Sequence, residues 1–110
     1  MRLRKTASVL TLLCSWILWE KWTVHNPGEP TQRLVEAVSE SKTLEECRAA
    51  SPELAKRRAN GFRTSYKEPD YNVTQGDFAA ILFDKRRKTT FMEYAYYCLP
   101  PTIDPYRDPR

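Results

Sequence analysis

The first nineteen residues limit what the rest of this chain can fold into. Three basic residues, Arg2, Arg4 and Lys5, precede an uncharged, mostly apolar run over residues 7–19. A basic start followed by an apolar stretch of this length is typical of a secretory signal peptide. The pattern predicts an exported protein whose folded part lies in an oxidising, periplasmic or extracellular compartment.

The apolar run is too short to cross the hydrocarbon core of a bilayer as a helix, because residues 7–19 would span only about 20 Å and the core is about 30 Å thick. We predict cleavage after Ser15, which assigns residues 1–15 to the signal peptide and makes Trp16 the first residue of the folded part. Two alternatives remain open. One is an uncleaved anchor to about residue 19, with membrane association through this segment, and the other is a lipoprotein acylated at Cys14.

The charge of the chain lies largely in this leader. The whole sequence has 18 basic and 14 acidic residues; without the three basic residues of the leader the counts are 15 and 14, so the net charge falls from +4 to +1. A nearly neutral domain has no general electrostatic attraction for phosphate backbones, so no nucleic-acid partner is expected. Residues 16–110 are predicted to form one small α+β domain with a Pro-rich C-terminal tail.

Two of the three cysteines lie in the predicted folded part. Cys47 and Cys98 remain after loss of the leader, and such a pair in an exported chain is more often bridged than free. A bridge would close a loop of about 50 residues, which is worth roughly 4 kcal/mol in the chain-entropy model. We therefore predict a structural disulfide between Cys47 and Cys98.

A helix is predicted from about Leu44 to Ala59. Thr43 with Glu46 three residues later is a capping-box pattern at its start, and Asn60-Gly61 is a stop signal at its end. Pro52 interrupts this stretch, because proline removes a backbone donor and clashes with the preceding turn. The helix must therefore kink or divide there, with Ser51 as the expected cap of the second piece.

Most other segments favour strands. Residues 16–24 are rich in β-prone side chains, and from Phe62 onward the pattern turns to strand. Residues 78–84 and 89–98 are expected to pair as a hairpin. Residues 34–38 suit either a short helix or a strand, and the pattern does not decide between them.

The second strand of this hairpin alternates in a way that predicts the fold. Met92, Tyr94, Tyr96 and Cys98 share one face, and the bridging cysteine should turn that face toward the helix. The predicted fold class is α+β, with a small antiparallel sheet, one main Pro-kinked helix packed on one face, and one disulfide.

The hairpin turn carries four consecutive cations, Lys85, Arg86, Arg87 and Lys88. Such a turn is a candidate contact for an anionic partner. A more common explanation is that the charges only keep the turn soluble and discourage edge-to-edge pairing of strands. We favour the second interpretation.

Residues for catalysis are few. The single histidine, His25, lies in a Pro/Gly-flanked segment, and none of the familiar nucleophile, phosphate-binding or metal-binding motifs is present. We expect no catalytic, cofactor or metal site.

Asn72-Val73-Thr74 is a glycosylation sequon only in a eukaryotic host. An aromatic recognition surface is one interpretation of five tyrosines, although packing on the sheet is the more common role of Tyr66, Tyr71, Tyr94, Tyr96 and Tyr97.

Both ends of the predicted domain carry short motifs. Trp16-Ile17-Leu18-Trp19 forms a W-x-L-W start, and the tail begins Cys98-Leu99-Pro100-Pro101-Thr102-Ile103-Asp104-Pro105. In these features the chain resembles a group of small exported bacterial proteins with a W-x-L-W start and a C-L-P-x-T-x-D-P tail. The resemblance implies export and a disulfide, and the group has no established activity to carry over.

The sequence thus predicts an exported, non-enzymatic domain that binds a protein or another component of the cell envelope, or acts there as an accessory. The alternative is a membrane-anchored accessory subunit of an envelope complex. A small envelope enzyme that uses carboxylates and tyrosines is a third, weaker hypothesis.

Overall fold

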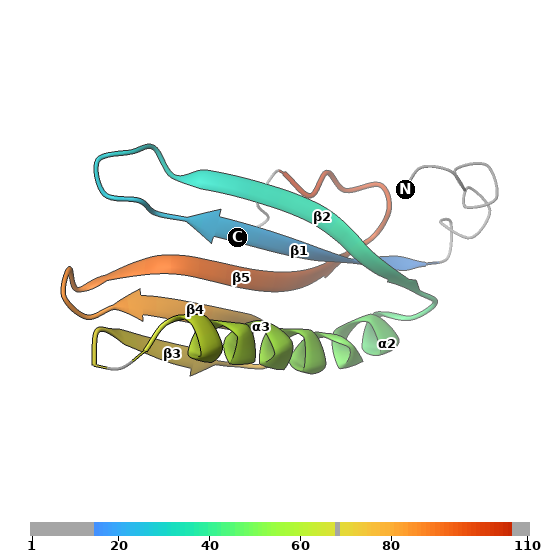
Figure 1. Cartoon of the computed structure of the whole chain (residues 1–110). Coiled ribbons are helices and arrows are strands. Elements are labelled where there is room, and N and C mark those ends of the chain that lie inside the picture. The colour runs from blue at the N-terminus through green and yellow to red at the C-terminus, as the bar shows by residue number, and fades with distance from the viewer. Residues whose placement is uncertain (1–14, 68, 107–110) are drawn as a thin grey trace.

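The computed structural model of the protein describes residues 15–67 and 69–106 (Figure 1). The elements follow one another as β1 (Trp16–Val24), β2 (Gln32–Ser41), α2 (Leu44–Ala49), α3 (Ser51–Ser65), β3 (Tyr71–Gln75), β4 (Ala79–Asp84) and β5 (Thr89–Leu99). The strands form one antiparallel sheet of order β2-β1-β5-β4-β3. The two helical pieces pack on one face of this sheet, which confirms the predicted α+β fold.

Strand β1 lies inside the sheet, between β2 and β5. It begins at Trp16, so the last four residues of the apolar run, up to Trp19, belong to the sheet. Ser15, just before the strand, is buried. The predicted signal peptide up to residue 14, including Cys14, lies outside the described residues. None of the helices that the described residues form is long and apolar enough to cross a bilayer.

The segment that the sequence left undecided, residues 34–38, lies in β2, an edge strand of the sheet. In the pairing with β1 the register shifts between Leu18 and Trp19, so a bulge interrupts this edge. Such a bulge discourages further strand pairing at an exposed edge. Leu34 and Val38 are among the large apolar side chains that remain exposed here.

The start and the division of the helix follow the prediction. The Thr43 hydroxyl accepts the Glu46 backbone N–H at 3.0 Å, and the helical segment divides at Ala50, with Pro52 in the first turn of α3. The prediction that Ser51 caps this second piece is wrong. Ala50 is the N-cap residue and has helical backbone angles, and the fully buried Ser51 hydroxyl instead lies within 3.0 Å of the Arg48 carbonyl oxygen and 2.8 Å of the Asp77 carbonyl oxygen.

The predicted end of the helix is also wrong, because α3 continues through Asn60-Gly61 to Ser65. Ala59 and Phe62 are buried against Ala80 and Leu82 of β4, and this burial continues the helix past the glycine. A glycine inside a helix costs only about 1 kcal/mol, which the burial of one Phe side chain exceeds. The strand pattern expected from Phe62 onward therefore begins only at β3.

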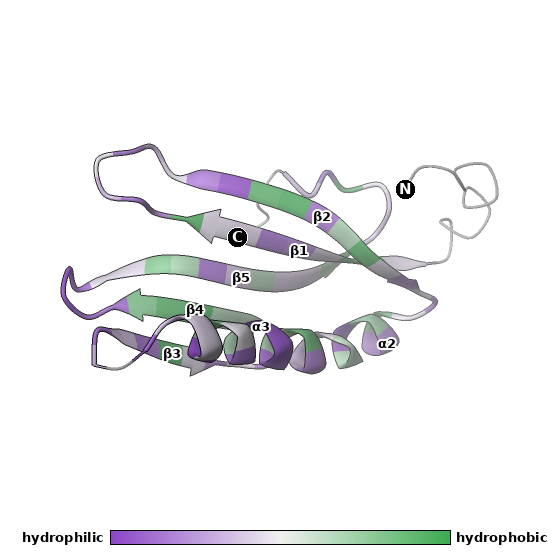
Figure 2. Cartoon of the chain, in the orientation of Figure 1, coloured by the Kyte–Doolittle hydropathy of each residue, from purple (hydrophilic) through white to green (hydrophobic). Residues whose placement is uncertain are grey.

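The core consists of two adjoining clusters between the helices and the sheet. The buried residues of one cluster are Leu18, Cys47, Ala55 and Tyr96, and those of the other are Ala59, Phe62, Ala80 and Leu82. Met92, Tyr94, Tyr96 and Cys98 of β5 all contribute to these clusters, as their alternation predicted. In Figure 2, β4 is mostly hydrophobic, whereas the turn that joins it to β5 is hydrophilic.

Candidate functional site

The predicted disulfide is present and joins the helical layer to the sheet. Cys47 of α2 and Cys98 of β5 are bonded, with their Cα atoms 6.2 Å apart. This distance lies within the usual range for a disulfide. Cys47 is fully buried beside Leu18 and Tyr96, so the bridge forms part of the core.

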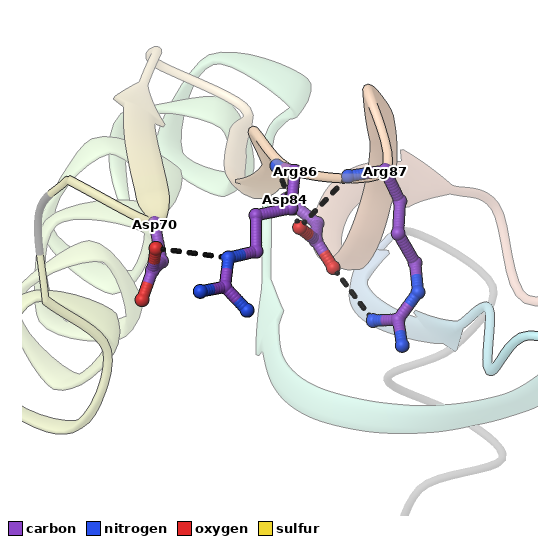
Figure 3. Close-up of polar contacts among 4 residues, drawn as sticks. All are labelled: Asp70, Asp84, Arg86 and Arg87. Atoms are coloured by element: carbon purple, nitrogen blue, oxygen red, sulfur yellow. Dashed lines mark hydrogen bonds and ion pairs between the residues drawn. The ribbon is translucent and has the colours of Figure 1, made fainter.

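The four predicted turn cations, Lys85–Lys88, connect β4 to β5 as expected. Arg86 and Arg87 form ion pairs with carboxylates (Figure 3). Arg87 Nη1 lies 3.0 Å from Asp84 Oδ2, and Arg86 Nε lies 3.2 Å from Asp70 Oδ1. The turn therefore neutralises part of its own charge.

The Asp84 carboxylate organises this turn. It is buried, and its Oδ1 accepts the backbone N–H groups of Arg86 at 3.0 Å and Arg87 at 3.2 Å. Burial alone would raise the pKa of Asp84, but the hydrogen bonds from Arg87 and Arg86 outweigh it and lower the pKa. Lys88 completes the turn in the left-handed region, with φ of 56°. These contacts explain the turn as a folding element.

Neutralising the turn is expected to change stability little. In a variant with Lys85, Arg86, Arg87 and Lys88 all replaced by Gln, Asp84 keeps both backbone donors. The two ion pairs that are lost come from arginines whose side chains are 77% and 60% exposed, so each is expected to contribute about 1 kcal/mol at most. Urea unfolding should therefore show only a small decrease in the free energy of unfolding of this variant. The matched comparison is Asp84→Ala, which removes the acceptor itself and should destabilise more. A larger loss in the quadruple variant than in Asp84→Ala would contradict this account.

The lowered pKa of Asp84 predicts a pH dependence of stability. Because the folded state favours the ionised carboxyl, this contribution is fully present above the unfolded pKa of about 4 and is lost as pH falls through the lower folded pKa. The stability advantage of the wild type over Asp84→Asn should therefore shrink below about pH 4. Urea unfolding at several pH values measures this difference in the free energy of unfolding, with Asp77→Asn as the control. A constant difference at all pH values would refute the prediction.

A second polar cluster links α3 to the sheet. Arg58 binds Glu20 of β1 through two hydrogen bonds, Nε to Oε2 at 2.9 Å and Nη2 to Oε1 at 3.0 Å. The Tyr96 hydroxyl donates to Glu20 Oε2 at 2.5 Å, and the Arg58 guanidinium lies 4.2 Å from the centre of the Tyr94 ring. Burial, together with the Glu20 carboxylate, raises the pKa of Tyr96.

Sequence reasoning missed this cluster. Neither Glu20 nor Arg58 was singled out from the sequence. The available signal was the alternation of β1, because Glu20 lies between Leu18 and Trp22 and shares a face of the strand with them. A single acidic side chain that points into the core is costly to bury unless an ion pair or hydrogen bonds compensate its charge.

A groove of about 250 Å³ lies beside this cluster and is lined by Glu20, Trp22, Leu34, Glu36, Arg58 and Tyr94. Both oxygens of Glu20 already accept hydrogen bonds within the protein. A carboxylate held in this way is poorly suited to act as a general base, because it would first have to break these bonds. The arrangement is better explained as a bond between the helix and the sheet.

A second pocket, of about 240 Å³, lies between the C-terminal end of α3 and β3, and is lined by Arg63, Tyr66, Lys67, Tyr71, Asn72 and Val73. Arg63 Nη1 donates to Asn60 Oδ1 at 2.9 Å and to Gln75 Oε1 at 3.3 Å. Lys67 Nζ donates to the Arg63 carbonyl oxygen at 3.3 Å. The partners of both cations in the described part of the chain are therefore neutral oxygens.

The tyrosines that the sequence singled out do not form one surface. Tyr66 and Tyr71 form an edge-to-face pair with ring centres 5.0 Å apart, and Tyr94 and Tyr96 pack against the helices. Tyr97 donates its hydroxyl to the Pro105 carbonyl oxygen at 2.9 Å and so binds the C-terminal segment. Packing thus accounts for most of them.

His25 lies in the segment between β1 and β2, where its Nδ1 is 3.1 Å from Thr31 Oγ1. Among residues 15–67 and 69–106, no three His, Cys, Asp or Glu side chains come together as metal ligands would. Comparison with models of protein families, with curated proteins and with solved structures finds no match to this chain.

Proposed function

We propose that the chain is an exported, non-enzymatic domain that binds a component of the cell envelope or serves there as an accessory. The Cys47–Cys98 disulfide is the observation that carries this proposal. Disulfides persist in oxidising compartments and are rare in the cytosol, and small exported domains use them to supplement a modest core.

The start of β1 supports a cleaved leader. Since Trp16–Trp19 pair with β2 and β5, the part of the apolar run that precedes β1 in the sequence is residues 7–15. As a helix this stretch would span about 14 Å, about half of the hydrocarbon core, whereas its length suits the apolar region of a signal peptide. Cleavage after Ser15 would leave the sheet intact from its first residue.

Two features favour binding over catalysis. The buried carboxylates Glu20 and Asp84 are both held by arginine and by further hydrogen bonds. Exposed apolar side chains remain at Leu34 and Val38 on the edge strand and at Phe78 before β4. Leu34 and Val38 lie four residues apart on the same edge strand, where exposed apolar side chains can contact a partner.

Cell fractionation tests the proposal. Cells that produce the chain are separated into soluble, exported and membrane fractions, the protein is alkylated under denaturing conditions, and its first residue and mass are read by mass spectrometry. We expect a start at Trp16 and no alkylated thiol. An unbridged pair of thiols in the cytosol would overturn the proposal. An intact Met1 in the membrane pellet, with the disulfide formed, would favour the anchored accessory subunit.

A further inference from the structure

The pocket between α3 and β3 combines cations, aromatic rings and an amide in one concave place. Arg63, Tyr66 and Lys67 come from the last turn of the helix and the residues after it, and Tyr71 and Asn72 come from the edge strand. Arg63, Lys67 and Asn72 are exposed, and the two rings are half-buried. The end of α3 and the edge strand β3 therefore hold these groups at the solvent-exposed surface.

The charge around this pocket is positive. The backbone carbonyl of Asp70, immediately before β3, accepts the Lys85 backbone N–H at 2.9 Å, and the Asp70 carboxylate pairs with the Arg86 guanidinium at 3.2 Å, so the pocket adjoins the basic turn. Residues 63–71 and 84–88 together contain six basic and three acidic residues, a net charge of +3. A local excess of this kind attracts anions although the whole domain is nearly neutral.

The two cations of the pocket are better placed for an anion than those of the turn. Both hydrogen bonds of the Arg63 guanidinium within the described residues engage Nη1 and end on amide oxygens. Its Nη2 and Nε have no acceptor among residues 15–67 and 69–106, and a guanidinium binds carboxylate or phosphate through two such donors. Arg86 and Arg87 of the turn, by contrast, already bind carboxylates.

We propose that this pocket binds an acidic sugar unit of an anionic polysaccharide. Arg63 and Lys67 would bind the carboxylate or phosphate of the sugar, the Tyr66 and Tyr71 rings, which lie edge to face, would contact its apolar side, and Asn72 would bond a hydroxyl group. The proposal rests on the proposed binding function in the envelope and names its ligand class.

A polysaccharide fits this end of the molecule better than a membrane surface. The exposed large apolar side chains of the described residues are Leu34, Val38, Phe78, Ile103 and Tyr106, and none of them lines the pocket or the basic turn. Proteins that bind the membrane interface insert such side chains beside their cations. A concave pocket with rings and a side-chain amide instead suits a single polar group with an apolar face.

Affinity electrophoresis of the exported, oxidised protein tests the proposal. Gels contain polygalacturonate, a chain of carboxylated sugars, or neutral dextran as the reference. We expect polygalacturonate alone to retard the protein, less so at high salt, because screening weakens contacts between exposed charges. The double variant Arg63→Gln, Lys67→Gln should bind about 10-fold more weakly. Asn72→Asp, which places a negative charge at the rim, should also weaken binding.

The matched control is Lys42→Gln, Lys56→Gln, which removes the same charge from exposed sites outside the pocket and should retain binding. Equal loss in this control, or no retardation of the wild type, would overturn the proposal. Equally strong binding to phosphatidylglycerol vesicles, lost in the same pocket variant, would also overturn it in favour of a lipid surface. An exported, bridged protein that ignores polygalacturonate would leave the general binding function standing and remove only this ligand.

Discussion

Reduction of the Cys47–Cys98 disulfide is expected to lower the melting temperature of the protein by roughly 20 °C. The bridge joins residues 51 apart in sequence, for which the chain-entropy model gives roughly 4 kcal/mol. In a domain of this size each kcal/mol shifts the melting temperature by about 4–8 °C. The bridge also fastens the short helix α2, which by itself is too short to be stable.

Thermal unfolding followed by circular dichroism, with and without reductant, measures this effect. The variant Cys47→Ala, Cys98→Ala should melt near the reduced wild type and should not respond to reductant. It should lie slightly lower, because Ala leaves a small cavity at the fully buried Cys47. A melting temperature of the wild type that reduction leaves unchanged would contradict the stabilising role of the bridge.

Features fixed by local chemistry were predictable from sequence. Thr43 caps the helical segment and Pro52 divides it, because capping and the missing proline N–H act within a few residues. The hairpin around Lys85–Lys88 and the inward face of β5 likewise followed from turn residues and two-residue alternation. The disulfide followed from counting the cysteines that remain after the predicted leader.

Features decided by tertiary contacts were not predictable in this way. The helix continues past Gly61 because Phe62 finds a buried place on the sheet, which the local stop signal does not reveal. Strand β2 was ambiguous because it is an exposed edge in which Val35 alone is buried. Its sequence therefore lacks the alternation that burial imposes on inner strands.

The candidate sites also depend on contacts between residues that are far apart in the sequence. The turn cations were recognised as a run, yet their pairing with Asp70 and Asp84 depends on how β3 meets the turn. The pocket at Arg63 and Tyr71 joins a helix end to an edge strand, so only the fold brings these residues together.

The Glu20 cluster gives the other large expected effect. Replacing Glu20 with Ala removes three hydrogen bonds and leaves the buried Tyr96 hydroxyl without its acceptor and Arg58 without its counterion. Breaking a buried ion pair typically costs about 3–5 kcal/mol. Because the Arg58 side chain is 44% exposed, water compensates part of this loss, and we expect about 2–3 kcal/mol.

A double-mutant cycle separates the contributions. Tyr96→Phe alone should cost about 1–2 kcal/mol, because it removes one hydrogen bond to a charged group. In the Glu20→Ala background it should cost less, by about 1 kcal/mol, since the acceptor is already gone.

The control is Glu36→Ala, directly opposite Glu20 on β2 and exposed, which should change stability by less than about 0.5 kcal/mol. Urea unfolding of the wild type, the three variants of the cycle and the Glu36→Ala control gives the values. Equal losses for Glu20→Ala and Glu36→Ala would contradict a stabilising role of the Glu20 cluster. Full additivity of Glu20→Ala with Tyr96→Phe would show that the Tyr96–Glu20 hydrogen bond contributes nothing.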